Sequence, residues 1–301
     1  MERSRHPRSA WTIRRSDGDR RISLETALAL ARAGCDVIIV GRNPLKGADA
    51  VSRVQRAVSH AAVRFETLDL ADLSSVASFA QRMENDRESL DLLVNNAGIM
   101  VPPKRQETRD GFELQFGTNY LGHFALTAHM MPLLSKGTEA RVVTVSSVAA
   151  RGGKIDFDNI NSEKHYRPME AYSQSKLACL MFALELQDRS RAAGWGVSSI
   201  AAHPGVSRTD LLHNAPGRNS LQGLARTFLW FLFQPVAQGA LPQLFAATSR
   251  DATSGGYYGP DRLGETRGHP QPARIPPQAL DRVAGRRLWE LSQRMTDLAK
   301  I

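Results

Sequence analysis

The sequence predicts an α/β fold with one doubly wound parallel sheet and helices on both of its faces. From Ile22 onward, short β-branched runs alternate with longer helix-forming stretches, a pattern typical of right-handed βαβ units. Turn residues follow each predicted strand. Polar residues and glycines recur directly after several strands, at the carboxyl edge where such sheets bind ligands. We therefore expect a functional site at that edge.

The first half of the chain predicts three helices and three strands. The helix expected at residues 24–33 is rich in Ala and Leu, and Gly34 suits its C-terminus. The strand Asp36–Gly41 is a continuous β-branched run, as in strands buried on both faces. The same alternation predicts a helix at 46–58, a strand at 63–68, a helix at 73–83 and a strand at 90–94.

The second half continues the alternation without a repeat or a linker that would divide the chain. It predicts a long helix at 112–134, a strand at 140–145, a long helix at 169–193, a strand at 197–201, a helix at 238–248 and a short last strand at 255–259. The final helix, at 279–298, is amphipathic, so we expect it to pack on the body of the protein or in a dimer contact. Four prolines before this helix predict an extended connection.

The composition of the 301 residues, 42% of them hydrophobic, suits one α/β domain with a full core. No apolar run approaches the ~18 residues of a membrane span, and the N-terminus has no apolar signal segment. The two cysteines, Cys35 and Cys179, match neither a disulfide framework nor a metal-ligand spacing. We therefore expect a cytoplasmic protein without a transmembrane segment and without a metal site.

The formal net charge of +9 raises the question of nucleic-acid binding. Residues 1–21 contain seven arginines against three acidic residues, so this short segment holds much of the excess. The remaining excess is spread along the chain without a continuous basic stripe or interleaved aromatic residues. It indicates a solvated surface that also favours anionic ligands, and we expect no nucleic-acid partner.

Tyr172 and Lys176 form a candidate catalytic pair, although this spacing by itself is common on exposed helices. They lie four residues apart in the helix expected at 169–193, so both side chains share one face. A phenol titrates near pH ~10, and an ammonium one turn away stabilises the phenolate and lowers the pKa of the tyrosine. A serine hydroxyl at the adjacent strand end, Ser146 or Ser147, can hold an alcohol or carbonyl oxygen. Such a group can transfer the proton that accompanies a hydride transfer.

The motifs of this chain, taken in order, resemble the short-chain dehydrogenase/reductase family, particularly its retinol dehydrogenase-like and protochlorophyllide reductase-like members. The matching motifs are Asn95-Asn96-Ala97-Gly98, Asn119, Ser147, Tyr172-x-x-x-Lys176 and Pro204-Gly205-x-x-x-Thr209. The resemblance extends over residues 22–297. It implies a Rossmann-type fold and an NAD(P)-dependent oxidoreductase that interconverts an alcohol and a carbonyl.

The resemblance also implies four catalytic residues. Tyr172 would be the general acid and base, and Lys176 would lower its pKa and bind the nicotinamide ribose. The second serine of the pair, Ser147, would hold the substrate oxygen together with Tyr172. Asn119 would hold a water molecule that links Lys176 to solvent. An asparagine at this place could alternatively cap or kink the long helix.

The cofactor contacts implied by the family are Ile22, Arg42, Asp69, Leu70, Asn96, Ala97, Gly98, Tyr172, Lys176, Pro204, Gly205, Val206 and Thr209. Asp69 would bind the adenine amino group, or it could cap the helix expected at 73–83. The segments at 96–98 and 204–205 are also compatible with plain turns.

Arg42 favours NADP(H) over NAD(H). An NAD site places a carboxylate at the end of the second strand, where it binds the ribose 2′-hydroxyl. Here that position has Arg42 and no acidic residue, and a guanidinium suits a 2′-phosphate.

The glycine-rich loop of the family is absent. Asp17, Arg21 and Ser23 stand where its three glycines belong, and losing two or three charge-assisted backbone bonds to phosphate costs roughly 3–9 kcal/mol. The first strand, expected at 11–15, has few apolar residues. We therefore treat residues 1–21 as an atypical basic segment that replaces the expected first strand and glycine loop, and 22–301 as the domain. A frameshift or misplaced start would explain this segment, and so would a diverged protein with weak cofactor binding.

The segment at about 207–235 is expected to cover the substrate. It is apolar and aromatic, which predicts a bulky apolar substrate, a partner helix or a lipid surface, or simply side chains that cover the core. We therefore predict an NADP(H)-dependent oxidoreductase that interconverts an alcohol and a carbonyl on an apolar small molecule, in a protein that forms homo-oligomers. The alternative is a catalytically impaired binding or scaffold protein of the same fold.

Overall fold

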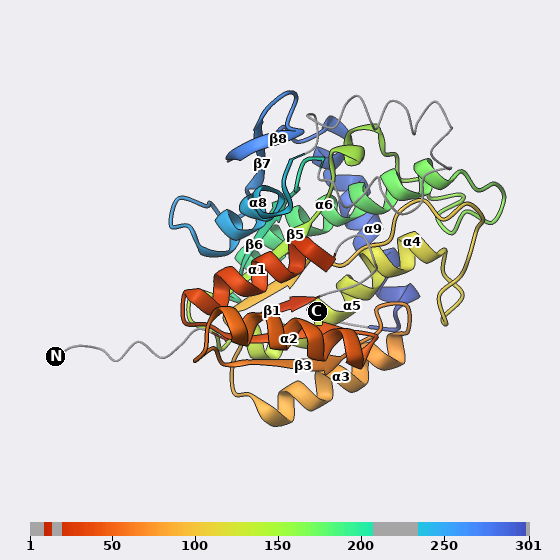
Figure 1. The fold of residues 1–301 in the computed structure, drawn as a ribbon. Coiled ribbons are helices and arrows are strands. Elements are labelled where there is room, and N and C mark those ends of the chain that lie inside the picture. Colours follow the sequence, from red (N-terminus) through yellow and green to blue (C-terminus); the bar gives the residue numbers. More distant parts are fainter. Residues whose placement is uncertain (1–8, 14–19, 207–233, 299–301) are drawn as a thin grey trace, which may run out of the picture.

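The computed structural model describes residues 9–13, 20–206 and 234–298, which form a parallel sheet between two layers of helices. The strands are β1 (Ser9–Ile13), β2 (Asp36–Gly41), β3 (Val63–Thr67), β4 (Leu92–Asn95), β5 (Arg141–Val145), β6 (Ser198–Ala202), β7 (Tyr257–Arg262) and β8 (Arg267–Pro272). Their order is β3-β2-β1-β4-β5-β6-β7-β8, and Figure 1 labels β3, β1, β5, β6, β7 and β8 in this succession. Strands β1 to β7 run parallel, and β8 returns antiparallel to β7. The predicted doubly wound α/β fold is confirmed.

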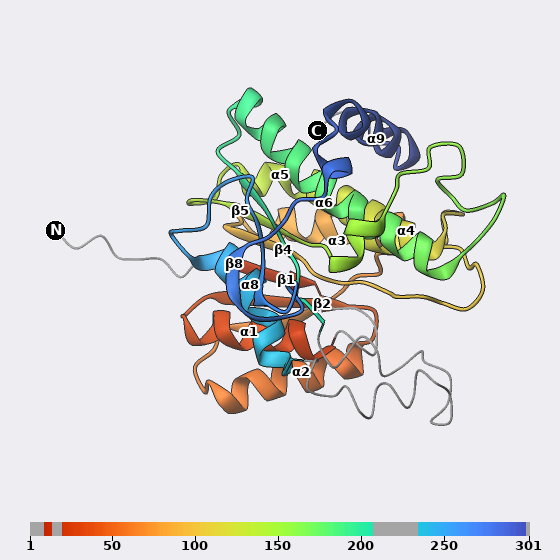
Figure 2. The same ribbon diagram turned by 90° about the horizontal axis from the view of Figure 1, so that it is seen from above.

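The helices divide between the two faces of the sheet. They are α1 (Arg20–Arg32), α2 (Pro44–Ala57), α3 (Leu73–Asp86), α4 (Leu114–Phe116), α5 (Gly122–Leu134), α6 (Pro168–Ala193), α8 (Val236–Thr248) and α9 (Arg282–Met295). Helices α1, α2 and α8 cover one face, and α3, α5 and α6 cover the other, with α9 outside α6 (Figure 2). Among the described residues, no helix has the length and apolar character needed to cross a bilayer.

The first strand forms despite its weak apolar pattern. It lies at Ser9–Ile13 rather than at 11–15, and it pairs with β2 on one side and β4 on the other. Two neighbouring strands therefore supply hydrogen-bond partners for its backbone. Residues 9–13 form the first strand themselves, so the hypothesis that residues 1–21 replace this strand does not hold for them. Of the three positions where the family has its loop glycines, Asp17 lies outside the described residues, and Arg21 and Ser23 lie in α1. The segment expected over the substrate also lies outside the described residues, except for its last two residues.

The long helix predicted at 112–134 is interrupted. Helix α4 leads into a π-helical turn, Gly117–Leu121, before α5 begins. A Cβ on Gly117 would collide with Thr108, and one on Gly122 would collide with the backbone of Leu70. These glycines allow close packing on both sides of the turn, and π-helical turns are frequent at functional sites.

Helix α9 packs on the body of the protein, which was one of the two predicted alternatives. Trp289 is buried and its ring stacks on that of Phe182, with centroids 5.8 Å apart. The guanidinium of Arg189 lies 4.4 Å from the Trp289 ring centroid. A buried hydrogen bond of 2.7 Å joins Tyr120 Oη to Ser292 Oγ. Asp281 caps the helix by accepting from two backbone N–H groups, so α9 begins later than the predicted helix.

Candidate active site

Lys176 ties α6 to the carboxyl end of β5. Its Nζ donates to the backbone oxygen of Val145 at 3.0 Å, and its side chain is buried. In the opposite direction, Ser146 Oγ donates to the Lys176 backbone oxygen at 2.7 Å. These two hydrogen bonds fix the helix turn that contains Lys176 against the strand end that precedes Ser147.

The two neighbouring serines have different surroundings. Ser146 is buried, and its hydroxyl donates its proton to the backbone oxygen of Lys176 in helix α6. Ser147 is half-buried, and its Oγ accepts from Ala149 N at 3.2 Å, which caps the 3-10 helix Val148–Gly152. Because a hydroxyl that accepts here still has a proton to donate, the geometry favours Ser147 over Ser146 as the residue that holds a substrate oxygen.

Tyr172 lies in the early part of α6, beside the loop that follows Ser147. The Tyr172 side chain is largely buried. The loop contacts α6 closely at the next residue, since a Cβ on Gly153 would lie 2.5 Å from the backbone oxygen of Ser173. Tyr172 and Lys176 therefore lie on a helix that is held at two points beside the end of β5.

Three other tyrosines are poorly suited to proton transfer near neutral pH. Burial, together with the nearby Glu113 carboxylate, raises the pKa of Tyr166 to about 12. Burial also raises the pKa values of Tyr120 and Tyr257 well above the usual range. Tyr166 Oη is moreover used in a 2.8 Å hydrogen bond to Pro102 O.

Asn119 lies in the π-helical turn and binds the loop after β4. Its Oδ1 accepts from Ile99 N at 2.8 Å, and its Nδ2 donates to Ile99 O and to Ser175 Oγ, both at 3.0 Å. A Cβ on Gly98 would lie 3.3 Å from Lys176 Nζ and 3.4 Å from Asn119 Oδ1. The structure therefore brings Asn119, Lys176 and the backbone at Gly98 together. The alternative that Asn119 caps the long helix is wrong, because its side chain bonds Ile99 and Ser175 and no helix end; the kink stays a prediction.

Arg42 and Asp69 lie at the ends of neighbouring strands. Arg42 Nη1 is 3.9 Å from Asp69 Oδ2, and both side chains are partly exposed. Asp69 Oδ1 accepts from Ala71 N at 2.9 Å. The alternative prediction that Asp69 caps α3 is wrong, because Asp72 accepts from the first N–H groups of that helix. The Leu70 side chain belongs to the core, so only its backbone can meet a ligand.

Asn96 joins the end of β4 to the start of α1. Its Nδ2 donates to Ser23 Oγ at 2.6 Å, and both side chains are buried. Ser23 stands where the family has its third glycine. Its hydroxyl therefore provides a hydrogen bond between α1 and the end of β4 that a glycine could not form. The side chains of Ile22 and Ala97 are also buried, which leaves their backbone groups for a cofactor.

The segment 204–206 is a turn held by the β7–β8 connection. Gly205 has a φ of +66°, which favours glycine, and a Cβ there would collide with the backbone oxygen of Thr266. Val206 N donates to the same oxygen at 2.8 Å. Gln234 Nε2 donates to Pro204 O. Thr209, also predicted to bind the cofactor, lies outside the described residues.

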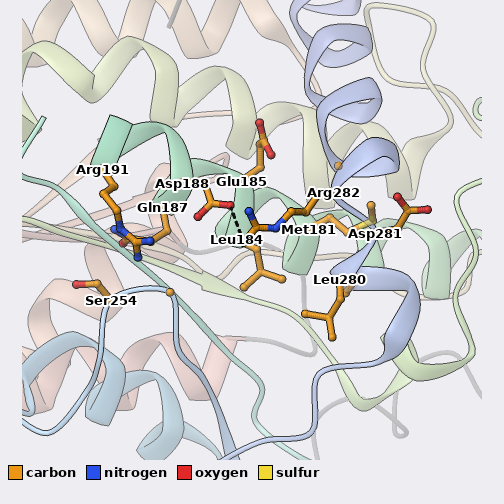
Figure 3. A pocket seen from close by; sticks show the side chains of 13 residues that line it. Met181, Leu184, Glu185, Gln187, Asp188, Arg191, Ser254, Leu280, Asp281 and Arg282 are labelled. Carbon is orange, nitrogen blue, oxygen red and sulfur yellow. Dashed lines mark ion pairs between the residues drawn. The ribbon is translucent and has the colours of Figure 1, made fainter. Parts of the chain in front are cut away.

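A cavity of about 250 Å³ lies away from these residues (Figure 3). It is enclosed by the later part of α6, from Met181 to Arg191, and by the start of α9. Arg282 extends across it toward Asp188, with Nη2 3.8 Å from Oδ2. A second cavity of about 260 Å³ lies beside Ala171. Neither is lined by Ser147, Tyr172 or Lys176.

Three residues beside the site were missed by the sequence reasoning. Glu265 Oε2 is 2.9 Å from His203 Nε2 and 2.5 Å from an Nη atom of Arg151. His203 could have been noticed, because it directly precedes Pro204. Glu265 had no signal, because it lies in the connection between β7 and β8 and strand β8 was not predicted.

Known proteins resemble the chain in sequence and in fold. The family model for short chain dehydrogenases matches residues 18–219. The chain is 38% identical over 286 residues to mouse retinol dehydrogenase 13, covering 92% of this chain and 81% of that protein. It is 39% identical over 243 residues to human polyprenol dehydrogenase, covering 79% of this chain and 72% of that protein.

Solved structures show the same architecture. A crystal structure of an uncharacterised protein from Mycobacterium paratuberculosis has a TM-score of 0.77 at 36% identity, covering 96% of this chain and 93% of that one. The NADP active-site complex of Pseudomonas aeruginosa RhlG has a TM-score of 0.64 at 22% identity, covering 83% of this chain and 93% of that one. The second resemblance concerns the fold alone.

Proposed function

Since the chain belongs to the short-chain dehydrogenase/reductase family and is a retinol dehydrogenase-like oxidoreductase acting on CH–OH groups, we propose that it uses NADP(H) to interconvert an alcohol and a carbonyl on a bulky apolar substrate. The observation that supports this most is the attachment of Lys176 to the end of β5, one residue before the serine pair. It brings a cation, a serine hydroxyl and the α6 turn of Tyr172 to one strand end.

The proposed proton chemistry uses three side chains. Tyr172 gives its proton to the carbonyl oxygen during reduction and takes a proton from the alcohol during oxidation. Ser147 donates a hydrogen bond to the same oxygen and holds it beside the phenol. The Lys176 ammonium, oriented by Val145 O, favours the phenolate. Bound NADP(H) supplies or accepts the hydride at the substrate carbon.

The described residues fit a dinucleotide. Gly98 keeps the backbone bare after β4, where a Cβ would lie 3.3 Å from Lys176 Nζ. Asn119 keeps the loop after β4 in place, and its oxygen has a second lone pair that can accept from a water molecule in a proton relay. Asn96 and Asp69 follow β4 and β3, where they would contact the cofactor.

Arg42 supports NADP(H) as the cofactor. Its guanidinium is about half exposed at the end of β2 and faces Asp69 at 3.9 Å. A 2′-phosphate there would add two charge-assisted hydrogen bonds to a guanidinium whose direction is already set. A nucleotide without this phosphate would leave Arg42 paired only with Asp69.

The apolar character of the substrate is supported by two observations. The relatives are called retinol dehydrogenase and polyprenol dehydrogenase, so both act on long apolar alcohols by name. The segment 207–233, which the family places over the substrate, is rich in apolar and aromatic residues in the sequence.

The test is the Tyr172→Phe variant, assayed with all-trans-retinol or a polyprenol and NADP⁺ and with the matching aldehydes and NADPH. Removing the acid–base group is expected to lower turnover by about 10²–10⁴-fold, while NADPH affinity, followed by tryptophan quenching, stays within about threefold. Tyr166→Phe is the control, because Tyr166 Oη bonds Pro102 O and Gln115. Unchanged turnover in Tyr172→Phe would refute the proposed role.

The same titration separates the alternative function. If wild-type protein fails to bind NADPH and NADH at millimolar concentration, the catalytically impaired binding protein becomes the better description. Its support is the absence of the three family glycines, whose positions are taken by Asp17, Arg21 and Ser23. Cytoplasmic location and homo-oligomer formation both stay predictions.

A further inference from the structure

We infer that Glu265 is a positioning residue for the proposed reaction, because it joins the loop after Ser147 to the turn at 204–206 through Arg151 and His203. The inference rests on the proposed function, since it concerns how the substrate-holding serine is placed relative to the nicotinamide end of the cofactor. Glu265 itself touches neither Ser147 nor Tyr172 among the hydrogen bonds and ion pairs of the described residues.

The imidazole of His203 connects Glu265 to the turn. His203 directly follows β6 and is buried. Its Nδ1 accepts from Gly205 N at 3.2 Å, so the ring proton lies on Nε2 and is donated to Glu265 Oε2 at 2.9 Å. A Cβ on Gly259 would collide with Nε2, so the ring is confined on that side. The direction of the Gly205 N–H group therefore depends on the Glu265 carboxylate.

Arg151 connects the same carboxylate to the serine loop. It lies in the 3-10 helix Val148–Gly152, which Ser147 caps. Its Nη2 is 2.5 Å from Glu265 Oε2, and its Nη1 donates to Gly264 O at 3.0 Å. Gln278 Nε2 donates to the backbone oxygens of Arg151 and Gly153 at 2.9 and 3.0 Å, which limits movement of the loop.

The charges in this cluster are balanced. Burial lowers the pKa of His203, so its ring is neutral near pH 7. Although burial opposes it, hydrogen bonds from His203 and Arg274 N, together with the Arg151 charge, hold the pKa of Glu265 below its usual value. One carboxylate therefore meets one guanidinium, and replacing either leaves a partly buried charge without its partner.

Glu265 therefore constrains both sides of the site at once. The serine loop and the turn at 204–206 begin at the ends of β5 and β6, which are neighbouring strands. They are joined again through the β7–β8 connection, where Glu265 lies. Because a misplacement of about 1 Å can cost about 100-fold in rate, loosening this connection should affect turnover more than cofactor affinity.

The experiment compares Glu265→Gln, Arg151→Gln, the double variant and the conservative Arg151→Lys. Glu265→Gln keeps an oxygen for Arg274 N but removes the charge, so kcat should fall about 10- to 100-fold with the Kd for NADPH within about threefold of wild type. The kcat of Arg151→Gln should fall by a similar factor, and the kcat of the double variant should fall no further. Arg151→Lys should recover most of the wild-type kcat. Glu290→Gln, exposed on α9, is the control.

Hydrogen exchange at Gly205 and Val206 gives a second measurement that needs no activity. Exchange at these amides should rise in Glu265→Gln and stay unchanged in Glu290→Gln. Unchanged exchange, additive losses in the double variant, or no recovery in Arg151→Lys would overturn the inference. If exchange rises as expected but wild-type protein has no NADP(H)-dependent turnover, the proposed function is what fails.

Discussion

At the scale of single residues, Gly98 has little room for a side chain between two groups of the site. A Cβ there would lie 3.3 Å from Lys176 Nζ and 3.4 Å from Asn119 Oδ1. Both groups are already bonded, to Val145 O and to Ile99 N. A side chain at 98 must therefore move at least one of them.

We expect Gly98→Ala to lower kcat/KM by about tenfold or more, because displacing Lys176 or Asn119 by tenths of an ångström misplaces the proton-transfer group. The measurement is steady-state kinetics, with Tm as a check on folding. Gly152→Ala is the matched control, since a Cβ there meets no atom within 4 Å. Equal activity of both variants would show that Gly98 is not close to the reacting groups.

Arg42 gives a prediction about cofactor choice. Arg42→Ala should raise the KM for NADPH by about 10- to 100-fold, because charge-assisted hydrogen bonds contribute about 1.5–3 kcal/mol and each 1.4 kcal/mol is about tenfold. The KM for NADH should change little. Arg53→Ala, which removes a surface pairing with Asp49 on α2, serves as control. Parallel changes for both nucleotides would contradict the NADP(H) assignment.

His203 predicts the pH dependence of stability. Burial lowers its pKa below the usual ~6.5, so the unfolded chain binds the proton more readily than the folded one. The stabilisation by the neutral ring is therefore complete above about pH 6.5 and is lost as pH falls through the folded-state pKa. The groups facing the ring are Glu265, Arg151 and the ring of Tyr257.

The Tm of wild type relative to His203→Gln should accordingly decline between pH 7 and pH 5. Differential scanning calorimetry of both proteins at several pH values measures this difference. The comparison is needed because the other histidines and the carboxylates that do not contact His203 titrate in both proteins alike, so the difference reports on His203 together with its partner Glu265. Two Tm curves that stay parallel over this range would contradict the predicted loss.

Residue types and spacing predicted much of the candidate site. Tyr172 and Lys176 were found from a four-residue helical spacing, and Ser147 from its place after a strand. The resemblance to the family already favoured Ser147 over Ser146, and the structure adds a physical reason, the hydrogen bond from Ser146 to the Lys176 carbonyl. The position of Glu265 beside the site depends on the β7–β8 hairpin, which lies far along the chain and which no local sequence pattern indicated.

At the scale of elements, α9 stabilises the fold through one large side chain. Trp289 stacks on Phe182 and meets Phe124 edge-on at 5.0 Å. We expect Trp289→Ala to lower the free energy of unfolding by about 3–5 kcal/mol, measured by urea denaturation. Leu280→Ala, at a side chain 58% exposed, should cost less than about 1 kcal/mol. Similar losses in both variants would mean that α9 is not docked through Trp289.

The elements that were predicted well have strong local patterns. Strand β2 was predicted with its observed bounds because a β-branched run is enclosed by Gly34 and Arg42. The π-helical turn was missed because it depends on contacts between Asn119 and the distant Ile99. Strand β8 was missed because Pro270 and Pro272 are rare in strands.

At the scale of the whole molecule, the parallel sheet gathers distant segments at one edge. The candidate cofactor residues follow β2, β3, β4, β5 and β6, and a ligand that binds there contacts several βαβ units at once. Alternation of strands and helices was enough to predict this gathering. It was not enough to predict how the first loop is built, because Asp17, Arg21 and Ser23 stand where the family has its glycines.

We expect NADPH to stabilise the whole fold. At 100 times its Kd, a ligand that binds only the folded state adds about 2.7 kcal/mol, which corresponds to a Tm rise of roughly 4–5 °C for a domain of this size. NADH at the same concentration should give a smaller rise, and Arg42→Ala should remove the difference. Thermal melts by tryptophan fluorescence measure these shifts. The absence of any shift would favour the impaired binding protein.

The prolines of β8 limit how copies of this protein can associate. Ala273 N donates to Tyr257 O at 2.8 Å. Because N–H groups alternate in direction along a strand, the odd-numbered positions of this part of the chain point their N–H groups toward β7. The even-numbered positions point away from β7. At those positions Pro270 and Pro272 have no N–H, and Gly268 N is already bonded to Gln234 Oε1 at 3.1 Å. A strand from a neighbouring molecule would find no donor along this rim. Backbone pairing between β8 and a strand of another subunit is therefore disfavoured.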